Sequence, residues 1–132
     1  MSATIVNPPT LAAPRGYSNG LAYPAGRILF VAGQVGWRTD GTFEDGMVAQ
    51  FDRALANVLE VVRAAGGLAE HVGRLTIFVS DKSAYLAATK AIGVAYRTHM
   101  GKHYPAMSLV QVAALLEEGA LVEIEATAVL PP

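Results

Sequence analysis

The chain has 132 residues, and we expect residues 1–132 to form a single domain because that length suits one hydrophobic core. Ten Lys and Arg side chains against eleven Asp and Glu give a net charge of −1 without a basic cluster, which argues against nucleic-acid binding. With no cysteine, no apolar run of about 18 residues and no signal-peptide pattern, the sequence predicts a cytoplasmic protein with neither disulfides nor a membrane span.

Three strands are predicted in the first third of the chain. Residues 4–6 form a short apolar run that suits an edge strand, and residues 17–23 suit a second strand. Residues 27–35 follow the turn residues 24–26 and are almost continuously apolar. Strands of that composition are usually buried on both faces, so we expect both faces of residues 27–35 to be covered.

Two long helices are predicted in the middle of the chain. Residues 47–65 place apolar side chains at three- and four-residue steps, with Gln50 among the polar residues on the other side. Gly66 and Gly67 end this helix, because glycine readily takes the left-handed conformation of a helix C-terminus. Residues 84–99 repeat the apolar pattern, and Ser83 is the expected N-cap.

The remaining strands are predicted at residues 74–79, 107–112 and 121–130. In the last of them apolar and polar side chains alternate: Val122, Ile124, Ala126 and Ala128 against Glu123, Glu125 and Thr127. The whole order predicts an α+β domain with one sheet and the two helices on one face. Because only 16% of the residues are charged, we expect the uncovered face to be buried by self-association.

Several short motifs, in order along nearly the whole chain, resemble the reactive intermediate deaminase (Rid, or YjgF-like) family. They are Gly16-Tyr17-Ser18-Asn19-Gly20, Val31-Ala32-Gly33-Gln34-Val35, Ala54-Leu55-Ala56-Asn57-Val58-Leu59 with Ala64-Ala65-Gly66-Gly67, Arg74-Leu75-Thr76-Ile77-Phe78-Val79 with Asp81, Tyr104-Pro105-Ala106-Met107-Ser108, and Gly119-Ala120-Leu121-Val122-Glu123-Ile124-Glu125-Ala126. The resemblance implies a chorismate-mutase-like fold with a mixed sheet, in a homotrimer whose sheets form a central barrel. It also implies small-molecule clefts between subunits and hydrolysis of reactive imines and enamines, such as 2-aminoacrylate, without a metal or organic cofactor.

The resemblance assigns roles to two side chains. Tyr17 matches the family tyrosine that closes over the ligand, and Glu123 matches the acid that holds the attacking water and exchanges protons with the leaving nitrogen. Hydrolysis of a C=N bond needs a base for water and an acid for ammonia, and one carboxyl group can serve in both roles. The plainer interpretations are an ion-paired glutamate on an exposed strand and an ordinary packed tyrosine.

Other positions depart from the deaminase branch of the family. Met107 stands where that branch has an arginine that grips the substrate carboxylate, which a thioether cannot imitate. Ala32, before Gly33, replaces a small hydroxyl residue, Leu109 replaces a cysteine or similar small residue, and Thr89 aligns near a helix asparagine. We therefore expect an apolar cleft for a larger or less charged ligand.

Two arginines are candidates to supply the missing cation. Arg15 lies close to Tyr17 in the sequence, and Arg38 follows Trp37. Either arginine can equally be a solvated loop residue. Trp37 suits an interface better than ligand stacking.

A metal site is not expected in this sequence. His99 and His103 are four residues apart, but Gly101 separates them, Pro105 follows, and no acidic residue lies near them in the sequence. The composition therefore favours a protein that works without a metal ion.

Three functions remain open at this point. The first is an imine or enamine hydrolase with altered substrate choice. The second is a non-catalytic module that binds a small molecule or another protein in the intersubunit clefts. A ribonuclease role, assigned to some family members, needs a basic surface that this sequence lacks.

Overall fold

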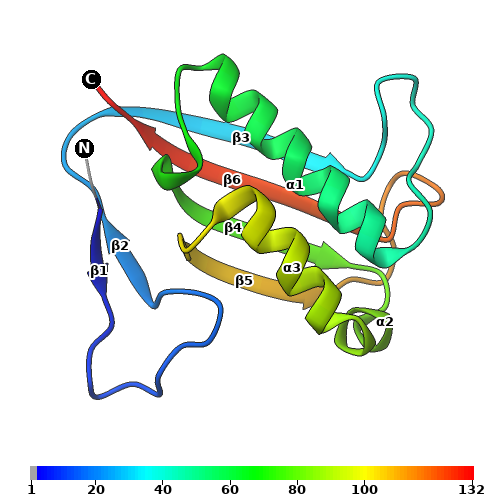
Figure 1. Ribbon diagram of the computed structural model, residues 1–132, viewed down its shortest axis with the longest axis horizontal. Helices are drawn as coiled ribbons and strands as arrows, with labels where there is room; N and C mark the ends of the chain where they lie inside the picture. Colours follow the sequence, from blue (N-terminus) through cyan, green and yellow to red (C-terminus); the bar gives the residue numbers. More distant parts are fainter. Residues whose placement is uncertain (1–2) are drawn as a thin grey trace.

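A four-stranded mixed sheet with helices on one face forms the body of the protein in the computed structural model, which describes residues 3–132 (Figure 1). The first two residues of the expected 1–132 domain lie outside the described residues. The sheet order is β3 (Arg27–Val35), β6 (Val122–Leu130), β4 (Val72–Val79) and β5 (Ala106–Gln111). Strands β4 and β5 run parallel, and the other neighbours are antiparallel. The α+β class and the mixed sheet are confirmed.

The core lies between the sheet and α1 (Met47–Ala64), which packs on β3 and β6. The predicted alternation in the last strand is confirmed, because the even-numbered residues of β6 are buried and the odd-numbered ones face the open side. The apolar stripe of α1 is also buried as predicted, and Gly66 ends the helix with φ of 90°. The strands predicted at 74–79, 107–112 and 121–130 differ from β4, β5 and β6 by at most two residues at either end.

One residue of the first helix was placed wrongly. Gln50 is buried, not on the polar side, and its side chain bonds to three backbone groups. Its amide nitrogen donates to the carbonyls of Glu44 and Gly119, and its amide oxygen accepts from Leu121 N at 2.8 Å. Buried polar groups are stable when hydrogen-bonded in this way, so Gln50 ties α1 to the turn before β6.

The second long helix is two helices, α2 (Lys82–Ala87) and α3 (Thr89–Met100). Asp81 is the N-cap in place of Ser83, and its carboxylate accepts a hydrogen bond from Ala84 N at 3.2 Å. The chain departs from helical geometry at Ala88, with φ −114° and ψ 13°. This break turns α2 away from the axis of α3 (Figure 1).

The predicted strand at 17–23 is wrong in length, and it does not belong to the main sheet. Only β2 (Gly20–Ala22) is a strand, and it pairs with β1 (Thr4–Val6) in a separate two-stranded ribbon that projects from the sheet (Figure 1). Ser18 explains the difference: its backbone N donates to Pro105 O, and its hydroxyl donates to Tyr104 O at 2.5 Å. The segment before β2 is therefore held at the start of β5.

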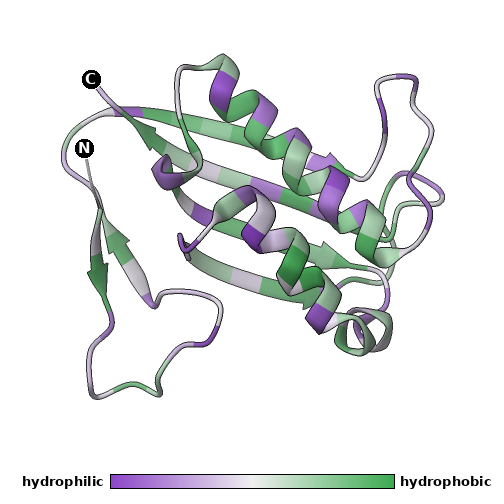
Figure 2. Cartoon of the chain, in the orientation of Figure 1, coloured by the Kyte–Doolittle hydropathy of each residue, from purple (hydrophilic) through white to green (hydrophobic). Residues whose placement is uncertain are grey.

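The face of the sheet opposite the helices remains open within one chain. Ile28 is 64% exposed, Phe30 78% and Val110 45%. Hydrophobic side chains occur along β3 on both faces of the strand. In Figure 2 much of the sheet is green, the colour of hydrophobic residues. Burial of this face by other subunits stays a prediction. Among residues 3–132, no helix is long and apolar enough to cross a membrane.

Candidate active site

Glu123 lies half-buried on the open face of the sheet, between β3 and β4. A register shift interrupts the pairing of β3 with β6 between Val31 and Gln34, so Ala32 and Gly33 form a bulge beside it. A Cβ added to Gly33 would lie 2.2 Å from Glu123 Oε2, so the carboxylate occupies the space that glycine leaves free. On its other side Glu123 pairs across strands with Phe78. We call Glu123, Ala32 and Gly33 the sheet cluster.

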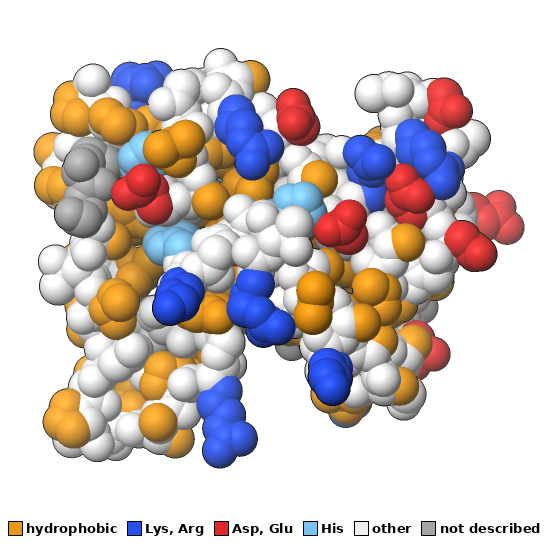
Figure 3. Space-filling view, in the orientation of Figure 1, with side chains coloured by type: hydrophobic (Ala, Val, Ile, Leu, Met, Phe, Trp, Pro, Cys, Tyr) orange, Lys and Arg blue, Asp and Glu red, His pale blue; other side chains and the backbone are white. Residues whose placement is uncertain are grey.

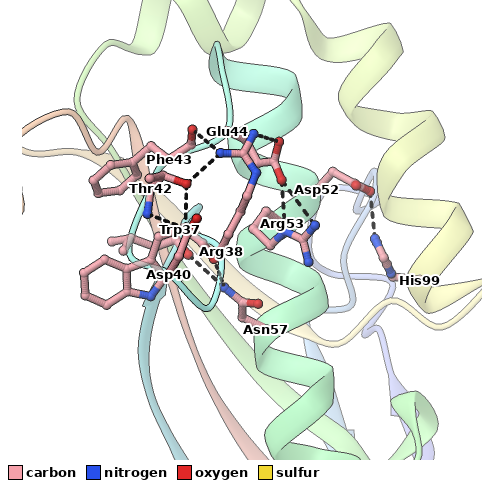
Figure 4. A network of polar contacts seen from close by, with 11 residues as sticks. Trp37, Arg38, Asp40, Thr42, Phe43, Glu44, Asp52, Arg53, Asn57 and His99 are labelled. Carbon is pink, nitrogen blue, oxygen red and sulfur yellow. Dashed lines mark hydrogen bonds and ion pairs between the residues drawn. The ribbon is translucent and has the colours of Figure 1, made fainter.

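The loop after β3 is held by a polar network that includes Arg38 (Figure 4). Arg38 contacts Glu44 Oε1 at 2.8 Å, and Arg53 contacts the other oxygen of the same carboxylate. Asn57 on α1 donates to the carbonyls of Val35 and Trp37, both at 3.1 Å. Arg38 is therefore engaged in holding this loop, and this arrangement does not support it as a replacement cation. The Trp37 ring packs on Phe43 with centroids 5.9 Å apart.

A second group of the predicted residues lies at the β5 edge of the sheet, on the helix side. Tyr17, Thr89 and Met107 line a cavity of about 670 Å³ between the N-terminal segment, α2, α3 and β5. Arg15 and Leu109 line a smaller cavity that shares the walls Tyr17 and Met107. We call Tyr17, Thr89, Met107, Leu109 and Arg15 the edge cluster. Figure 3 shows this hollow between the N-terminal segment and the α2–α3 part of the molecule, with basic side chains on both sides.

Aromatic rings make up much of the larger cavity. Four of the five tyrosines line it, and Phe51 closes its inner end. Tyr96 stacks on Tyr104 with centroids 5.5 Å apart and an interplanar angle of 8°. Burial raises the pKa of Tyr96, whose hydroxyl donates to His103 O, and burial also raises the pKa of Tyr85. Both phenols therefore stay neutral at ordinary pH and do not repel an anion.

The structure thus brings the predicted residues together in two groups, not one. Met107 pairs with Leu75, and both face the helix side, whereas Glu123 faces the open side. Within one chain the carboxylate and the cavity lie on opposite faces of the sheet. Any site that uses both groups needs two copies of the chain.

The two histidines considered for a metal have separate structural partners. His99 Nε2 lies 2.7 Å from Asp52 Oδ1 and links α3 to α1 (Figure 4). The sequence did not reveal this acidic partner, which is 47 residues away. His103 Nε2 contacts Val72 O at 2.7 Å. In the part of the chain that the structure describes, no three metal-ligating side chains cluster.

Sequence reasoning missed three residues of the cavity. Tyr85, Tyr96 and Arg97 fall within the helix predicted for residues 84–99, but the sequence indicated no binding role for them. The spacing of Thr89, Gly93 and Arg97 at four-residue steps was the available signal, because it puts all three on one face of a helix.

Comparison with known proteins agrees with this α+β architecture. The family model described as Endoribonuclease L-PSP matches residues 8–130. The protein DfrA of Myxococcus xanthus is 35% identical over 115 residues, which are 86% of this chain and 84% of that protein. A 2-iminobutanoate/2-iminopropanoate deaminase of Salmonella typhimurium is 34% identical over 131 residues, 98% of each chain.

A solved structure extends the similarity to the fold. The crystal structure of YyfB from Yersinia pestis, a protein of the conserved Rid family whose function is unknown, matches with a TM-score of 0.87 and 36% identity. The match covers 98% of this chain and 100% of that one. This chain belongs to the Rid family, also known by the names YjgF and L-PSP.

Proposed function

We propose that the protein hydrolyses reactive imines or enamines to a carbonyl compound and ammonia, in sites that form between subunits of a homotrimer. Each site combines the sheet cluster of one subunit with the edge cluster of the next. Homology to the 2-iminobutanoate/2-iminopropanoate deaminase of Salmonella typhimurium supports this class of reaction. No cofactor takes part in the proposed reaction.

The observation that carries the proposal is the setting of Glu123. The side chain is half-buried beside Phe78 and makes no hydrogen bond or ion pair with any residue from 3 to 132. Partial burial of an unpaired carboxylate raises the free energy of the folded protein unless a ligand, water or another subunit pairs with the carboxylate. Gly33 keeps the space around it clear.

The chemistry follows from a carboxylate that exchanges protons. Glu123 accepts a proton from water while the water oxygen adds to the imine carbon, the π electrons of the C=N bond move to nitrogen, and the carboxyl group passes that proton to the nitrogen. Glu123 then accepts the hydroxyl proton of the tetrahedral adduct and passes it to the nitrogen as the C–N bond breaks. A C=O bond forms, ammonia leaves, and the carboxylate is regenerated.

Met107 sets this protein apart within the proposal. It takes the position at which the deaminase branch holds an arginine, so a small imino acid loses its main charged contact. Loss of one bidentate charged contact costs about 2–5 kcal/mol. We therefore propose that 2-aminoacrylate and similar small imines are poor substrates.

Ammonia release tests the proposal directly. An amino-acid oxidase generates imines from a panel of amino acids, and the rate above free imine breakdown is measured with native protein and with Glu123→Gln. We expect Glu123→Gln to lose at least about 100-fold in rate, as expected for removal of a general acid–base group. No acceleration for any imine, together with ligand binding, would favour a binding module over an enzyme.

Mixing two inactive variants tests whether the site is shared. Glu123→Gln lacks the acid, and Thr89→Trp fills the cavity of the edge cluster. In a randomly mixed trimer about a quarter of the interfaces join one intact half of each kind, because the interface is heterologous. Recovery of that fraction of activity supports a shared site, and no recovery from folded, co-assembled variants contradicts it.

A further inference from the structure

The edge cavity is lined by an arginine that forms no ion pair within residues 3–132. Across residues 3–132, Arg97 forms no ion pair and no side-chain hydrogen bond. The residue lines the 670 Å³ cavity together with Thr89 and Gly93 of the same helix. Arg97 is exposed, so its guanidinium is free to pair with a group from outside residues 3–132.

Gly93 places the guanidinium of Arg97 at the cavity. A Cβ added to Gly93 would lie 3.2 Å from Arg97 Nη1 and 4.0 Å from Nη2, so the guanidinium folds back over the glycine along the helix face. The backbone of α3 thereby brings the cation next to the wall formed by Tyr96 and Tyr104.

The rest of the cavity is apolar and large. Its lining places Phe51, Ile77 and Ile92 at the inner end, against the core. Met107 lies at the junction with the smaller cavity that Arg15 lines. A cavity of this size with a few polar groups suits a ligand with a substantial apolar part and one group that fixes its orientation.

We infer that the edge cavity binds carboxylates with a bulky apolar or aromatic arm, with the carboxylate on Arg97 and the arm among the tyrosine rings. This inference rests on the proposed function, which supplies the reaction. It adds the class of substrate: imines of amino acids that have large apolar side chains. A guanidinium pairs two parallel N–H groups with a carboxylate, so Arg97 supplies from α3 the charged contact that Met107 on β5 cannot.

Binding of unreactive probes tests this inference without any turnover. The probes are 3-phenylpropanoate, its neutral amide 3-phenylpropanamide, and butanoate, titrated calorimetrically into the native protein. We expect 3-phenylpropanoate to bind at least tenfold more tightly than either of the other two. Equal binding of acid and amide overturns the assignment of a carboxylate, and equal binding of 3-phenylpropanoate and butanoate overturns the bulky arm.

Variants of two cations on α3 locate the carboxylate. Arg97→Gln should abolish the preference for acid over amide, whereas Lys90→Gln removes the same charge from a residue outside the cavity and should retain the preference. Melting curves confirm that both variants fold. If Arg15→Gln abolishes the preference and Arg97→Gln does not, Arg97 is not the carboxylate site.

Failure of the inference and failure of the proposed function give different results. A protein that releases ammonia only from small imines, unaffected by Arg97→Gln, is a hydrolase with another substrate class. A protein that binds 3-phenylpropanoate through Arg97 but releases no ammonia from any imine keeps the inferred ligand class and is not an enzyme of the proposed kind.

Discussion

The sheet cluster and the edge cluster are held in different ways. Glu123 lies on β6, an inner strand of the sheet, and Gly33 lies in the bulge of β3 that faces its carboxylate. The edge cluster combines residues of the N-terminal segment, such as Tyr17, with α3 and the edge strand β5, and α1, α2 and β4 also contribute to the walls of its cavity. If the proposed chemistry rests on β6 and β3 and ligand recognition on the edge cluster, the two can change separately, which is one way for a fold to serve several substrates.

Among these predictions, the largest effect is expected when a methyl group is added at Gly33 in the sheet cluster. Gly33→Ala places its Cβ in the position of the Glu123 carboxylate, which must swing away. We expect at least about a 100-fold loss of ammonia release. The melting temperature should change little, because only the end of a flexible side chain moves.

Gly20→Ala is the matched control for that substitution. Its Cβ would meet Val6 Cβ at 3.5 Å, an ordinary contact, so activity should be kept. Probe binding in the edge cavity should be unchanged in both variants. Full activity in Gly33→Ala would show that the position of the Glu123 carboxylate does not matter for ammonia release. The sheet cluster would then have no role distinct from that of the edge cluster.

The next prediction tests whether substrate recognition by the edge cluster can be changed while Glu123 keeps its proposed catalytic role. Met107→Arg adds a charged contact on β5, so we expect at least about a tenfold faster release of ammonia from small imines. The gain should be partial, because the resemblance predicts that Ala32 and Leu109 differ from the deaminase branch as well. Adding Glu123→Gln should remove the gain.

Two outcomes would change the interpretation of Met107. A native protein that matches a family deaminase on 2-aminoacrylate would mean that another arginine already serves small substrates. A folded Met107→Arg variant without any gain would weaken the catalytic role of Glu123.

A smaller effect is expected at the start of α2, which carries Tyr85 to the cavity. Asp81→Ala removes the N-cap hydrogen bond and should cost about 1 kcal/mol, or about 3–5 °C in melting temperature. Ser83→Ala, two residues on, should change nothing, since Ser83 is not the cap. If Ser83→Ala has the larger effect in thermal melts, the cap is misassigned.

The smallest effect is a dependence on alkaline pH near the N-terminal ribbon. Burial, aided by Glu70, raises the pKa of Tyr23 from 10.0 to about 12, and its hydroxyl donates to Glu70 O and Val72 O. The unfolded state loses this proton first, so the free energy of unfolding is constant below about pH 10 and falls between pH 10 and 12. The pKa of Tyr96 and Tyr85 is raised as well, so they contribute in the same direction.

Urea titrations between pH 9 and about pH 11.5 measure this effect. The free energy of unfolding of Tyr23→Phe should fall less steeply with pH than that of the native protein over that range, because one titrating group is gone. An identical slope in the two proteins would mean that Tyr23 ionises equally well in the folded state.

Local patterns predicted most of the fold because they depend on neighbouring residues. The stripe of α1 and the alternation in β6 each repeat over several turns or residue pairs, so the prediction was nearly complete. The N-cap was misassigned because both Asp81 and Ser83 suit the position. Only the structure distinguishes them, because it shows the Asp81 carboxylate accepting a hydrogen bond from Ala84 N.

The site was predicted less completely, for a similar reason. The resemblance implies a cleft between subunits, and within one chain hydrogen bonds from Ser18 to residues 104 and 105 hold the tyrosine segment on the other side of the sheet from Glu123. Contacts between residues so far apart leave no periodic signal in the chain. Arg97 is one exposed arginine among several until the N-terminal segment is placed opposite it.

The space above Gly33 also has an evolutionary consequence. Any other side chain at this position competes with the carboxylate for the same volume, so selection for the carboxylate's position acts on the glycine as well. Gly33 has no side chain of its own, so under the proposed function a lineage that gave up the reaction would lose this constraint on residue 33. Retention or drift at this one position in descendants of the chain therefore records whether the carboxylate is still in use.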